Sequence, residues 1–173
     1  MERALNGTGR PIIKHDDVRA ACNSWRIYND ISRSWEFIAG TIRYVEKFQA
    51  IIAAAQRPGG WNDPDMLVIG LPNVTVDQAV VQMTLWSIWS APLIISNDLR
   101  DLAPEFKEIL LNRDVIAIDQ DPMGISGSVG AYLKPITPTR DDKTSFAMAV
   151  VNKNELEVKA CSILRLHAAR VHR

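Results

Sequence analysis

In MLVIGLPNVTVDQAVVQMTLWSIWSAPLIISND, residues 66–98, two short apolar runs flank a longer periodic segment. "MLVIG" (66–70) is an apolar run closed by glycine, which is typical of a strand buried on both faces. "LIISND" (93–98) is a second such run, and residues 75–92 between them have the pattern of a helix. A strand, a helix and a strand in this order predict a parallel sheet with a helical crossover, and therefore an α/β fold.

Two further helices extend this pattern in both directions. Residues 32–56 repeat apolar side chains at three- and four-residue spacing, with Ser32 as a plausible N-cap and "RPGG" (57–60) as a stop. The apolar positions are Trp35, Ile38, Ile42, Val45 and Ile52. A helix is also expected at about residues 103–112. Helices of this kind alternate with the strands, as βα units require.

The strand ends of the predicted sheet direct attention to acidic residues. In parallel sheets the carboxyl ends of the strands face the functional side, because the strand bodies themselves are dry. Asp98 ends the run 93–98, Asp30 ends 25–31 if that segment is a strand, and 115–121 is expected to be extended. The acids of "WNDPDM" (61–66) stand before a strand core, where they could cap its start or reach the site through a bulge. The candidate acids are Asp30, Asp63, Asp65, Asp98, Asp119 and Asp121.

Paired carboxyl groups are the usual apparatus for cleaving a glycosidic bond, one protonating the leaving oxygen and the other attacking or activating water. Arg26 stands four residues before Asp30 and could support such a pair. The structural alternative is that these acids form turns, cap helices or make ordinary ion pairs. The tryptophans could form a sugar-stacking platform, although Trp86 and Trp89 have the helical spacing of core residues. The tryptophans are Trp25, Trp35, Trp61, Trp86 and Trp89.

Composition excludes several classes of function. The 173 residues carry 20 basic and 20 acidic side chains, so the chain lacks the basic face that nucleic acid or a membrane surface would require. A neutral ligand fits better. No apolar run reaches the roughly 18 residues of a spanning helix, and residues 1–10 are polar where a signal peptide would be apolar. We therefore expect no targeting or membrane segment.

Motifs for metals, cofactors and covalent nucleophiles are missing as well. Cys22 and Cys161 stand far apart without a C-x-x-C spacing, so the sequence indicates neither a zinc site nor a redox motif, and we expect them not to be bonded to each other. No G-x-S-x-G, phosphate-binding glycine loop or H-E-x-x-H occurs. Sequons at Asn6 and Asn73 matter only in a secreted or lysosomal setting. We expect neither a metal nor a cofactor.

The amino-acid composition of the sequence changes after Pro122. Glycines, serines and prolines lead into "SFAMAVVNKNE" (145–155), an alternating strand followed by a turn, which looks like the opening of a small β domain. The basic stretch 160–173 shows no obvious partner strand. We expect a catalytic-type domain at residues 1–124 and the start of a β domain, with a divergent tail, at 125–173.

Several runs together carry a family resemblance. They are "ALNGTGRP", "CNSWRIYNDISRSW", "PGGWNDPDMLVIG", "SAPLIISNDLR" and "DVIAIDQDPMGISG". In this order they resemble the α-galactosidase and α-N-acetylgalactosaminidase family of lysosomal glycoside hydrolases, over about residues 1–127. The resemblance implies the C-terminal part of a (β/α)8 barrel followed by the beginning of an antiparallel β domain. It also implies a homodimeric, disulfide-containing glycoprotein that needs no cofactor.

The resemblance implies an activity and a set of site residues. The family removes terminal α-galactose or N-acetylgalactosamine from glycolipids, glycoproteins and oligosaccharides, with retention of configuration. Matched motif by motif, Asp30 is the general acid/base and Arg26 holds the sugar hydroxyl next to the nucleophile. Asp65 and Met66 line the galactose pocket, and Asp63 is structural. The acid must be protonated when the leaving oxygen departs and then act as base for the attacking water.

The chain departs from the family pattern in four places. The aspartate nucleophile and a "Y-S-C-x-W-P" segment that recognises the substituent on the second sugar carbon have no match, so Cys22 is expected to lack its disulfide partner. Asp119 stands where the family has an asparagine. The resemblance ends at about Asn154. We expect a fragment that aggregates or stays partly molten alone, because its parallel strands would leave edges and a dry face uncovered.

Two functional hypotheses follow. In the first, the complete protein is a retaining hydrolase in which Asp30 works as acid/base. In the second, the 173-residue chain is catalytically inactive and at most binds a sugar or pairs with a full-length subunit, because it lacks the nucleophile. For the isolated chain the second hypothesis is favoured, and for the complete protein the first.

Overall fold

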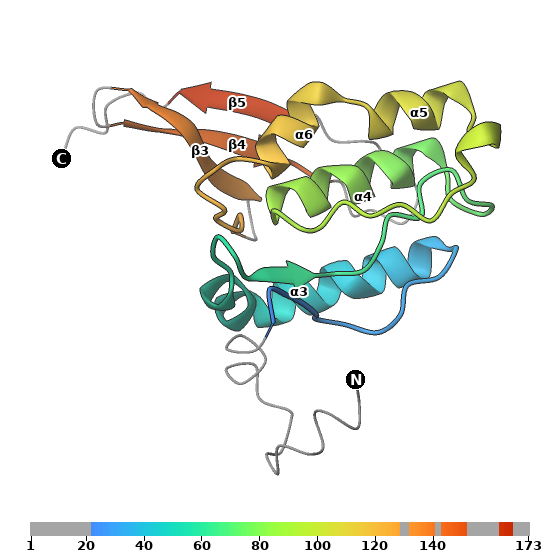
Figure 1. Ribbon diagram of the computed structural model, residues 1–173, viewed down its shortest axis with the longest axis horizontal. Helices are drawn as coiled ribbons and strands as arrows, with labels where there is room; N and C mark the ends of the chain where they lie inside the picture. Colours follow the sequence, from blue (N-terminus) through green and yellow to red (C-terminus); the bar gives the residue numbers. More distant parts are fainter. Residues whose placement is uncertain (1–21, 129–131, 141–142, 152–162, 168–173) are drawn as a thin grey trace, which may run out of the picture.

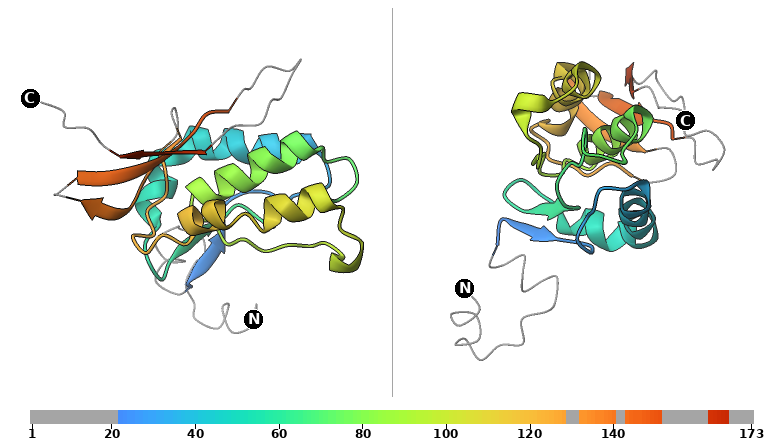
Figure 2. Two further views of the ribbon diagram at one scale, coloured as in Figure 1. Left: turned by 90° about the horizontal axis from the view of Figure 1, so that it is seen from above. Right: turned by 90° about the vertical axis from the view of Figure 1, so that its right-hand side faces the viewer.

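The structure is a computed structural model of the 173-residue chain, and it describes residues 22–128, 132–140, 143–151 and 163–167. Helix α4 lies at the centre of the arrangement (Figure 1). Helix α3 and two short strands lie on one side of it, while α5 and α6 pack on the other. Figure 2 shows the C-terminal sheet, β3 to β5, at one end of these helices. None of the helices in the described part of the chain is long and apolar enough to span a membrane.

Helix α3 (Trp35–Ala55) confirms the prediction for residues 32–56, although Ser34 rather than Ser32 is the N-cap. The helix buries the predicted apolar residues Ile38, Ile42, Val45 and Ile52 and partly buries Trp35, and its backbone is interrupted only at Phe48. It ends at the expected stop, where Arg57 and Gly60 exchange backbone hydrogen bonds of 3.0 and 2.8 Å. The period of the apolar residues therefore sets which face of α3 meets the core.

Helix α4 (Val76–Ile88) confirms the helix expected within 75–92. It begins with a capping box, because the Thr75 side chain accepts from the Gln78 amide and the Gln78 side chain accepts from the Thr75 amide. The helix is buried over most of its circumference, as a helix apolar all round should be. Trp86 and Trp89 are buried against each other with ring centroids 5.3 Å apart, so both are core residues.

Residues 99–119, which lie between α4 and the C-terminal sheet, are mainly helical, and here one prediction was wrong. A 3-10 turn η1 (Leu99–Asp101) precedes α5 (Pro104–Leu110), which confirms the helix expected at 103–112. Residues 115–121 were expected to be extended, but α6 occupies Arg113–Asp119. The reason is the Asn112 side chain, which caps the helix by accepting from the amides of Asp114 and Val115 at 3.1 and 3.2 Å.

The parallel strands are shorter and lie earlier in the sequence than expected. Strand β1 (Ser24–Arg26) pairs in parallel with β2 (Trp61–Asp63), with Arg26 opposite Asp63. The run 66–70 was expected to be a strand, but it follows β2 and makes only an isolated parallel bridge between Leu67 and Ile95. Gly70 ends this run at φ +81°, where a side chain would meet Leu102 at 2.6 Å, so the backbone turns away.

The segment 93–98 was also expected to be a buried strand, and this prediction was wrong. It contributes only the bridge at Ile95, and Ile94 is 55% exposed. The described residues therefore form a partial α/β unit and not a closed barrel. The parallel direction of the predicted pairing is nevertheless confirmed, both by β1 with β2 and by Leu67 with Ile95.

Asn62 fixes the pairing of β1 with β2 from inside the core. This residue is 4% exposed, and its side-chain oxygen accepts from the Trp25 indole at 3.0 Å. Its amide nitrogen donates to the Ile52 carbonyl at 2.7 Å and to the Gln56 side chain at 3.0 Å. These bonds connect both strands to the end of α3, so the start of the sheet and the helix are held as one unit.

The C-terminal sheet is antiparallel in the order β3–β4–β5. Strand β3 (Leu133–Arg140) pairs with β4 (Lys143–Ala149), which confirms the strand expected from residue 145. The terminal stretch was expected to lack a partner, but β5 (Ile163–His167) pairs with β4, Ser145 lying opposite His167. Strand periodicity within five residues is too weak to reveal such a long-range pairing. The boundary proposed between residues 124 and 125 remains a prediction.

The sheet is joined to the helices by buried polar contacts. The Lys134 ammonium group on β3 reaches the end of α4, where it donates to the Ser87 carbonyl at 3.2 Å and to the Ser90 hydroxyl at 2.6 Å. Tyr132 donates its hydroxyl to the Glu46 carboxylate on α3. The β sheet is consequently anchored to α3 and α4 at the same time.

Candidate active site

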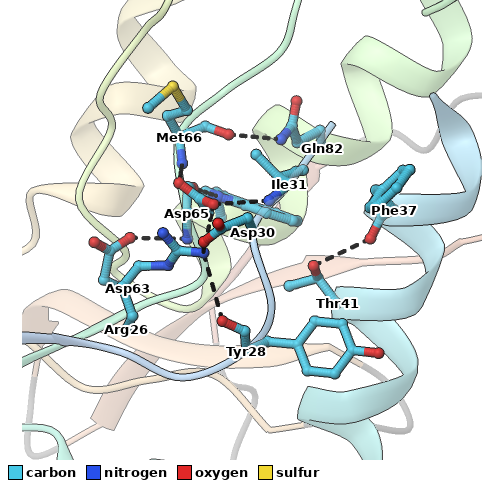
Figure 3. A network of polar contacts seen from close by, with 11 residues as sticks. Arg26, Tyr28, Asp30, Ile31, Phe37, Thr41, Asp63, Asp65, Met66 and Gln82 are labelled. Atoms are coloured by element: carbon cyan, nitrogen blue, oxygen red, sulfur yellow. Dashed lines mark hydrogen bonds and ion pairs between the residues drawn. The ribbon is translucent and has the colours of Figure 1, made fainter. Parts of the chain in front are cut away.

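Strands β1 and β2 bring the predicted site residues together. Their parallel register places Arg26 and Asp63 level at the carboxyl ends of the strands. Asp30 follows β1 through a short loop, while Asp65 and Met66 follow β2 directly. Figure 3 shows these side chains gathered around the Arg26 guanidinium. The acids of "WNDPDM" thus belong to the end of a strand, which is the functional side of a parallel sheet.

One guanidinium nitrogen of Arg26 contacts both candidate carboxylates. Arg26 Nη2 lies 2.5 Å from Asp65 Oδ2 and 3.1 Å from Asp30 Oδ1. The two acids differ sharply in environment, since the Asp65 side chain is 9% exposed and that of Asp30 is 98% exposed. Arg26 is therefore neutralised mainly by the nearer, buried Asp65, while Asp30 shares the guanidinium and remains exposed to solvent.

Asp65 is held in place from several directions. Its Oδ2 accepts from the Ile31 amide at 2.8 Å, and its Oδ1 accepts from the Met66 amide at 2.8 Å. The backbone of Asp65 is left-handed, with φ 81°, and its amide donates to Asp63 Oδ1 at 2.8 Å. The bond to Ile31 ties the loop that carries Asp30 to β2. Asp63 thus supports the unusual backbone of Asp65 and does not approach Asp30 by any hydrogen bond in the described residues.

Helix α4 supports this site from the core side. The Trp86 indole donates to the Asp65 carbonyl at 2.7 Å. Gln82 donates to the Met66 carbonyl at 3.3 Å and accepts from the Val68 amide at 3.0 Å. Both residues are fully buried, and Met66 is 38% exposed beside the acids. Sequence reasoning missed this role, although a glutamine between the apolar residues Val81 and Met83 was a signal that a buried polar partner exists.

The remaining candidate acids lie elsewhere. Asp98 is paired with Arg100 at 2.6 Å on the surface, and the hydrogen bonds from Arg100 hold the pKa of Asp98 below its usual value. Asp119 and Asp121 are buried at the end of α6, away from the Arg26 cluster. The structure therefore joins Arg26 with Asp30, Asp63 and Asp65 and separates them from the other three acids.

The described residues contain no group of three or more histidines, cysteines, aspartates or glutamates placed to hold a metal ion. Cys22 carries an exposed free thiol, while Cys161 lies outside the described residues. Asn73 is exposed in a left-handed turn, and Asn6 lies outside the described residues.

What the cluster can do chemically follows from its layout. An exposed carboxyl group at a strand end can give a proton to a substrate oxygen or take one from water. The buried Asp65 and the guanidinium of Arg26 present further acceptors and donors to the same space, as sugar hydroxyls require. The arrangement suits proton transfer at a polar, uncharged substrate.

Known proteins resemble this chain over most of its length. The family model described as Alpha galactosidase A matches residues 1–121. Alpha-galactosidase A of Homo sapiens is 37% identical over 90% of this chain and 40% of the relative. Alpha-N-acetylgalactosaminidase of Gallus gallus is 41% identical over 79% of this chain and 40% of the relative.

A solved structure is also similar to this chain. A candidate alpha-galactosidase/melibiase from Bacteroides fragilis has a TM-score of 0.63 at 25% identity, over 84% of this chain and 40% of that chain. The chain spans two fifths of the length of each of these relatives. The family model covers well over half of the chain, and the human relative is 37% identical along most of it. This chain belongs to the Alpha galactosidase A family.

Proposed function

We propose that the chain forms part of a retaining glycoside hydrolase that removes terminal α-linked galactose or N-acetylgalactosamine, with Asp30 as general acid/base. Family membership and the names of the relatives support the substrate class. The observation that carries the assignment of Asp30 is the Arg26 bridge, which places an exposed carboxylate beside a buried one at the ends of two parallel strands. By the same resemblance, the complete protein is a lysosomal homodimer.

Each residue of the cluster has a definite part in this proposal. Asp30 protonates the leaving oxygen and then activates the water that releases the sugar. Asp65 keeps two backbone amides and Arg26 as partners, and its remaining lone pairs accept a sugar hydroxyl. Arg26 donates to another hydroxyl, and Met66 contributes an apolar edge. Gln82 and Trp86 are positioning residues, since they act through the backbone of Asp65 and Met66.

A second candidate function for the 173-residue chain is sugar binding without turnover. A retaining mechanism needs a free carboxylate about 5 Å from the acid. The described carboxylate that shares Arg26 with Asp30 is Asp65, and it is tied to the guanidinium and two backbone amides. A carboxylate bound in this way is a poor nucleophile. We therefore expect the isolated chain to bind galactose weakly and not to hydrolyse a galactoside.

The hydrolase assignment is tested in a chimera. Residues 22–66, which carry β1, α3 and β2, replace the matching segment of human alpha-galactosidase A, and hydrolysis of p-nitrophenyl α-galactoside is measured. We expect an active chimera in which Asp30→Asn lowers kcat/KM by roughly a hundredfold or more, because acid/base catalysis is lost. The loss should be smaller with a 2,4-dinitrophenyl leaving group, which needs little protonation. Glu36→Gln, which changes an acid in the first turn of α3, is the matched control.

Two outcomes would contradict the assignment. A folded Asp30→Asn chimera with the parent's activity would remove Asp30 from catalysis. An equal loss for both leaving groups would assign it a structural part instead. The isolated chain is assayed in parallel with p-nitrophenyl α-galactoside and its N-acetyl analogue at acid pH. Turnover by the isolated chain that disappears in Asp30→Asn would mean that another carboxylate serves as nucleophile, and would exclude the binding-only function.

A further inference from the structure

Asp30 lies in a loop with few backbone attachments. At one end of the loop the Ile27 amide donates to the Asp63 carbonyl at 3.0 Å. At the other end the Ile31 amide donates to Asp65 Oδ2 at 2.8 Å. The three amides between these ends make no hydrogen bond within the described part of the chain. The Asp30 side chain is 98% exposed, and an exposed ion pair holds a side chain only weakly, so the rest of the loop must set its position.

The Tyr28 side chain attaches the middle of this loop to helix α3. Its ring lies against the Tyr44 ring with centroids 4.7 Å apart, and the Tyr44 ring lies at the same distance from Phe48. All three rings are partly buried and pack against the core. Figure 3 shows the Tyr28 ring directed toward α3 and away from the Asp30 carboxylate. Aromatic pairs at this distance attract each other beyond the effect of the area they bury, so the ring holds the loop on the helix.

Gly40 on α3 leaves room for the Tyr28 ring. A Cβ atom at this position would lie 3.5 Å from Tyr28 Cε1 and 3.7 Å from the Tyr28 hydroxyl oxygen. These are ordinary van der Waals separations, so alanine would fit, whereas a longer side chain would displace the ring. Helix α3 thus limits where the ring can lie, both by contact with Tyr44 and by the space at Gly40.

The backbone of Tyr28 is linked to the acidic cluster. Its carbonyl accepts from Arg26 Nη2 at 3.4 Å, and the same nitrogen lies 3.1 Å from Asp30 Oδ1. Tyr28 therefore contacts α3 through its ring and the partner of Asp30 through its carbonyl. Because Asp30 follows two residues later in the same loop, a shift of the ring would move the acid as well.

We propose that Tyr28 is a positioning residue, which sets the distance from Asp30 to the leaving oxygen of the substrate through the packing of its ring on α3. The inference rests on the proposed function, because it concerns proton transfer by Asp30. A displacement of about 1 Å from the productive geometry can cost on the order of a hundredfold in rate. Sugar binding should depend less on the ring, because Asp65 and Met66 follow β2 and are held by α4.

The test uses the human alpha-galactosidase A chimera that carries residues 22–66 of this chain. Tyr28→Ala should lower kcat for p-nitrophenyl α-galactoside by about ten- to a hundredfold, with KM changed by less than about threefold. The loss should be smaller with the 2,4-dinitrophenyl leaving group, which needs little protonation. Tyr28→Phe retains the ring and should recover most of the lost rate. Phe37→Ala, which removes a ring of α3 that is 43% exposed, is the matched control.

Two further variants separate positioning from a general loss of structure. Tyr28→Ala added to Asp30→Asn should cost little more than Asp30→Asn alone, because Tyr28 acts through the acid. Gly40→Leu leaves Tyr28 unchanged but displaces its ring, so it should reproduce the loss in kcat, whereas Gly40→Ala should not. The Gly40 pair also serves as the test if Tyr28→Ala does not fold.

The outcomes distinguish this inference from the proposed function. If Asp30→Asn keeps the activity of the parent chimera, the proposed function fails, and the positioning role fails with it. If Asp30→Asn loses activity but folded Tyr28→Ala or Gly40→Leu chimeras keep the parent's kcat, the positioning role alone is excluded. An equal loss for both leaving groups, or additive losses in the double variant, would show that Tyr28 only supports the fold.

Discussion

At the scale of single residues, the buried Asp119 carboxyl group makes the stability of the fold depend on pH. Desolvation raises its pKa from 3.8 to about 6, while the Gln120 hydrogen bond and the Lys134 charge act in the opposite direction. The folded protein therefore holds this proton more tightly than the unfolded chain does. The resulting stabilisation is fully present below about pH 4 and is lost as the pH rises through about 6.

The prediction is a comparison of the chain with Asp119→Asn. Between pH 4 and pH 6.5 the free energy of unfolding of the parent should fall, relative to the variant, by on the order of 2 to 3 kcal/mol. Urea denaturation at several pH values measures both proteins, and the carboxylates that they share cancel in the difference. A difference that stays constant over this range would show that Asp119 has an ordinary pKa in the folded protein.

The site residues differ in how far sequence could predict them. The motif around Arg26 and Asp30 identified both side chains, and the structure brings them together with Asp65. The support from Gln82 and Trp86 could not be predicted, because it depends on how α4 packs behind β2. The environment of Asp119 was also out of reach, since a change from amide to acid gives no indication of burial.

At the scale of secondary structure elements, the Thr75 side chain caps and stabilises the start of the buried helix α4. The Thr75 hydroxyl accepts from the Gln78 amide at 3.3 Å, and the Thr75 amide donates to the Gln78 side-chain oxygen at 3.0 Å. Thr75→Ala should reduce the free energy of unfolding by about 1 kcal/mol, because the Gln78 amide loses its side-chain acceptor. Thr75→Ser retains it and should cost much less. Urea denaturation measures both, and equal losses would contradict a role for the cap.

Elements with a local cause were predicted, and those with a distant cause were not. Helices α3, α4 and α5 follow from apolar period and capping residues, and they lie where expected. Helix α6 also has a local signal in Asn112, which the apolar run after it concealed. Strand β5 is different, since its pairing with β4 depends on a contact far along the chain.

At the scale of the whole molecule, an apolar groove lies beside α5 and α6. It has a volume of about 490 Å³, and its walls include Ile95, Leu99 and Leu111. Leu99 and Leu111 are 65% and 61% exposed. Apolar side chains gathered in this way favour association with another surface. The expectation that the isolated chain aggregates or stays partly molten was based on uncovered parallel strands and remains a prediction; this groove is a separate apolar surface.

We expect the purified chain to self-associate in a concentration-dependent way. The double substitution Leu99→Lys and Leu111→Lys should raise the monomer fraction, because it places charge at the rim of the groove. Ile51→Lys is a matched control, since Ile51 is equally exposed at 58% but lies on α3. Sedimentation velocity over a range of concentrations measures the outcome. A chain that stays monomeric throughout, or a control that acts as strongly as the double substitution, would contradict self-association through the groove.

The buried Asn62 amide has a consequence for how the whole chain folds. Strands β1 and β2 pair over only three residues each, too few for backbone hydrogen bonds alone to select one alignment. In any other alignment the Trp25 indole and the Asn62 side-chain oxygen would lose each other as partners, at a cost of about 1 to 3 kcal/mol for each orphaned group. Asn62 thus destabilises misaligned pairings of β1 with β2, in which Arg26 and Asp65 would not meet.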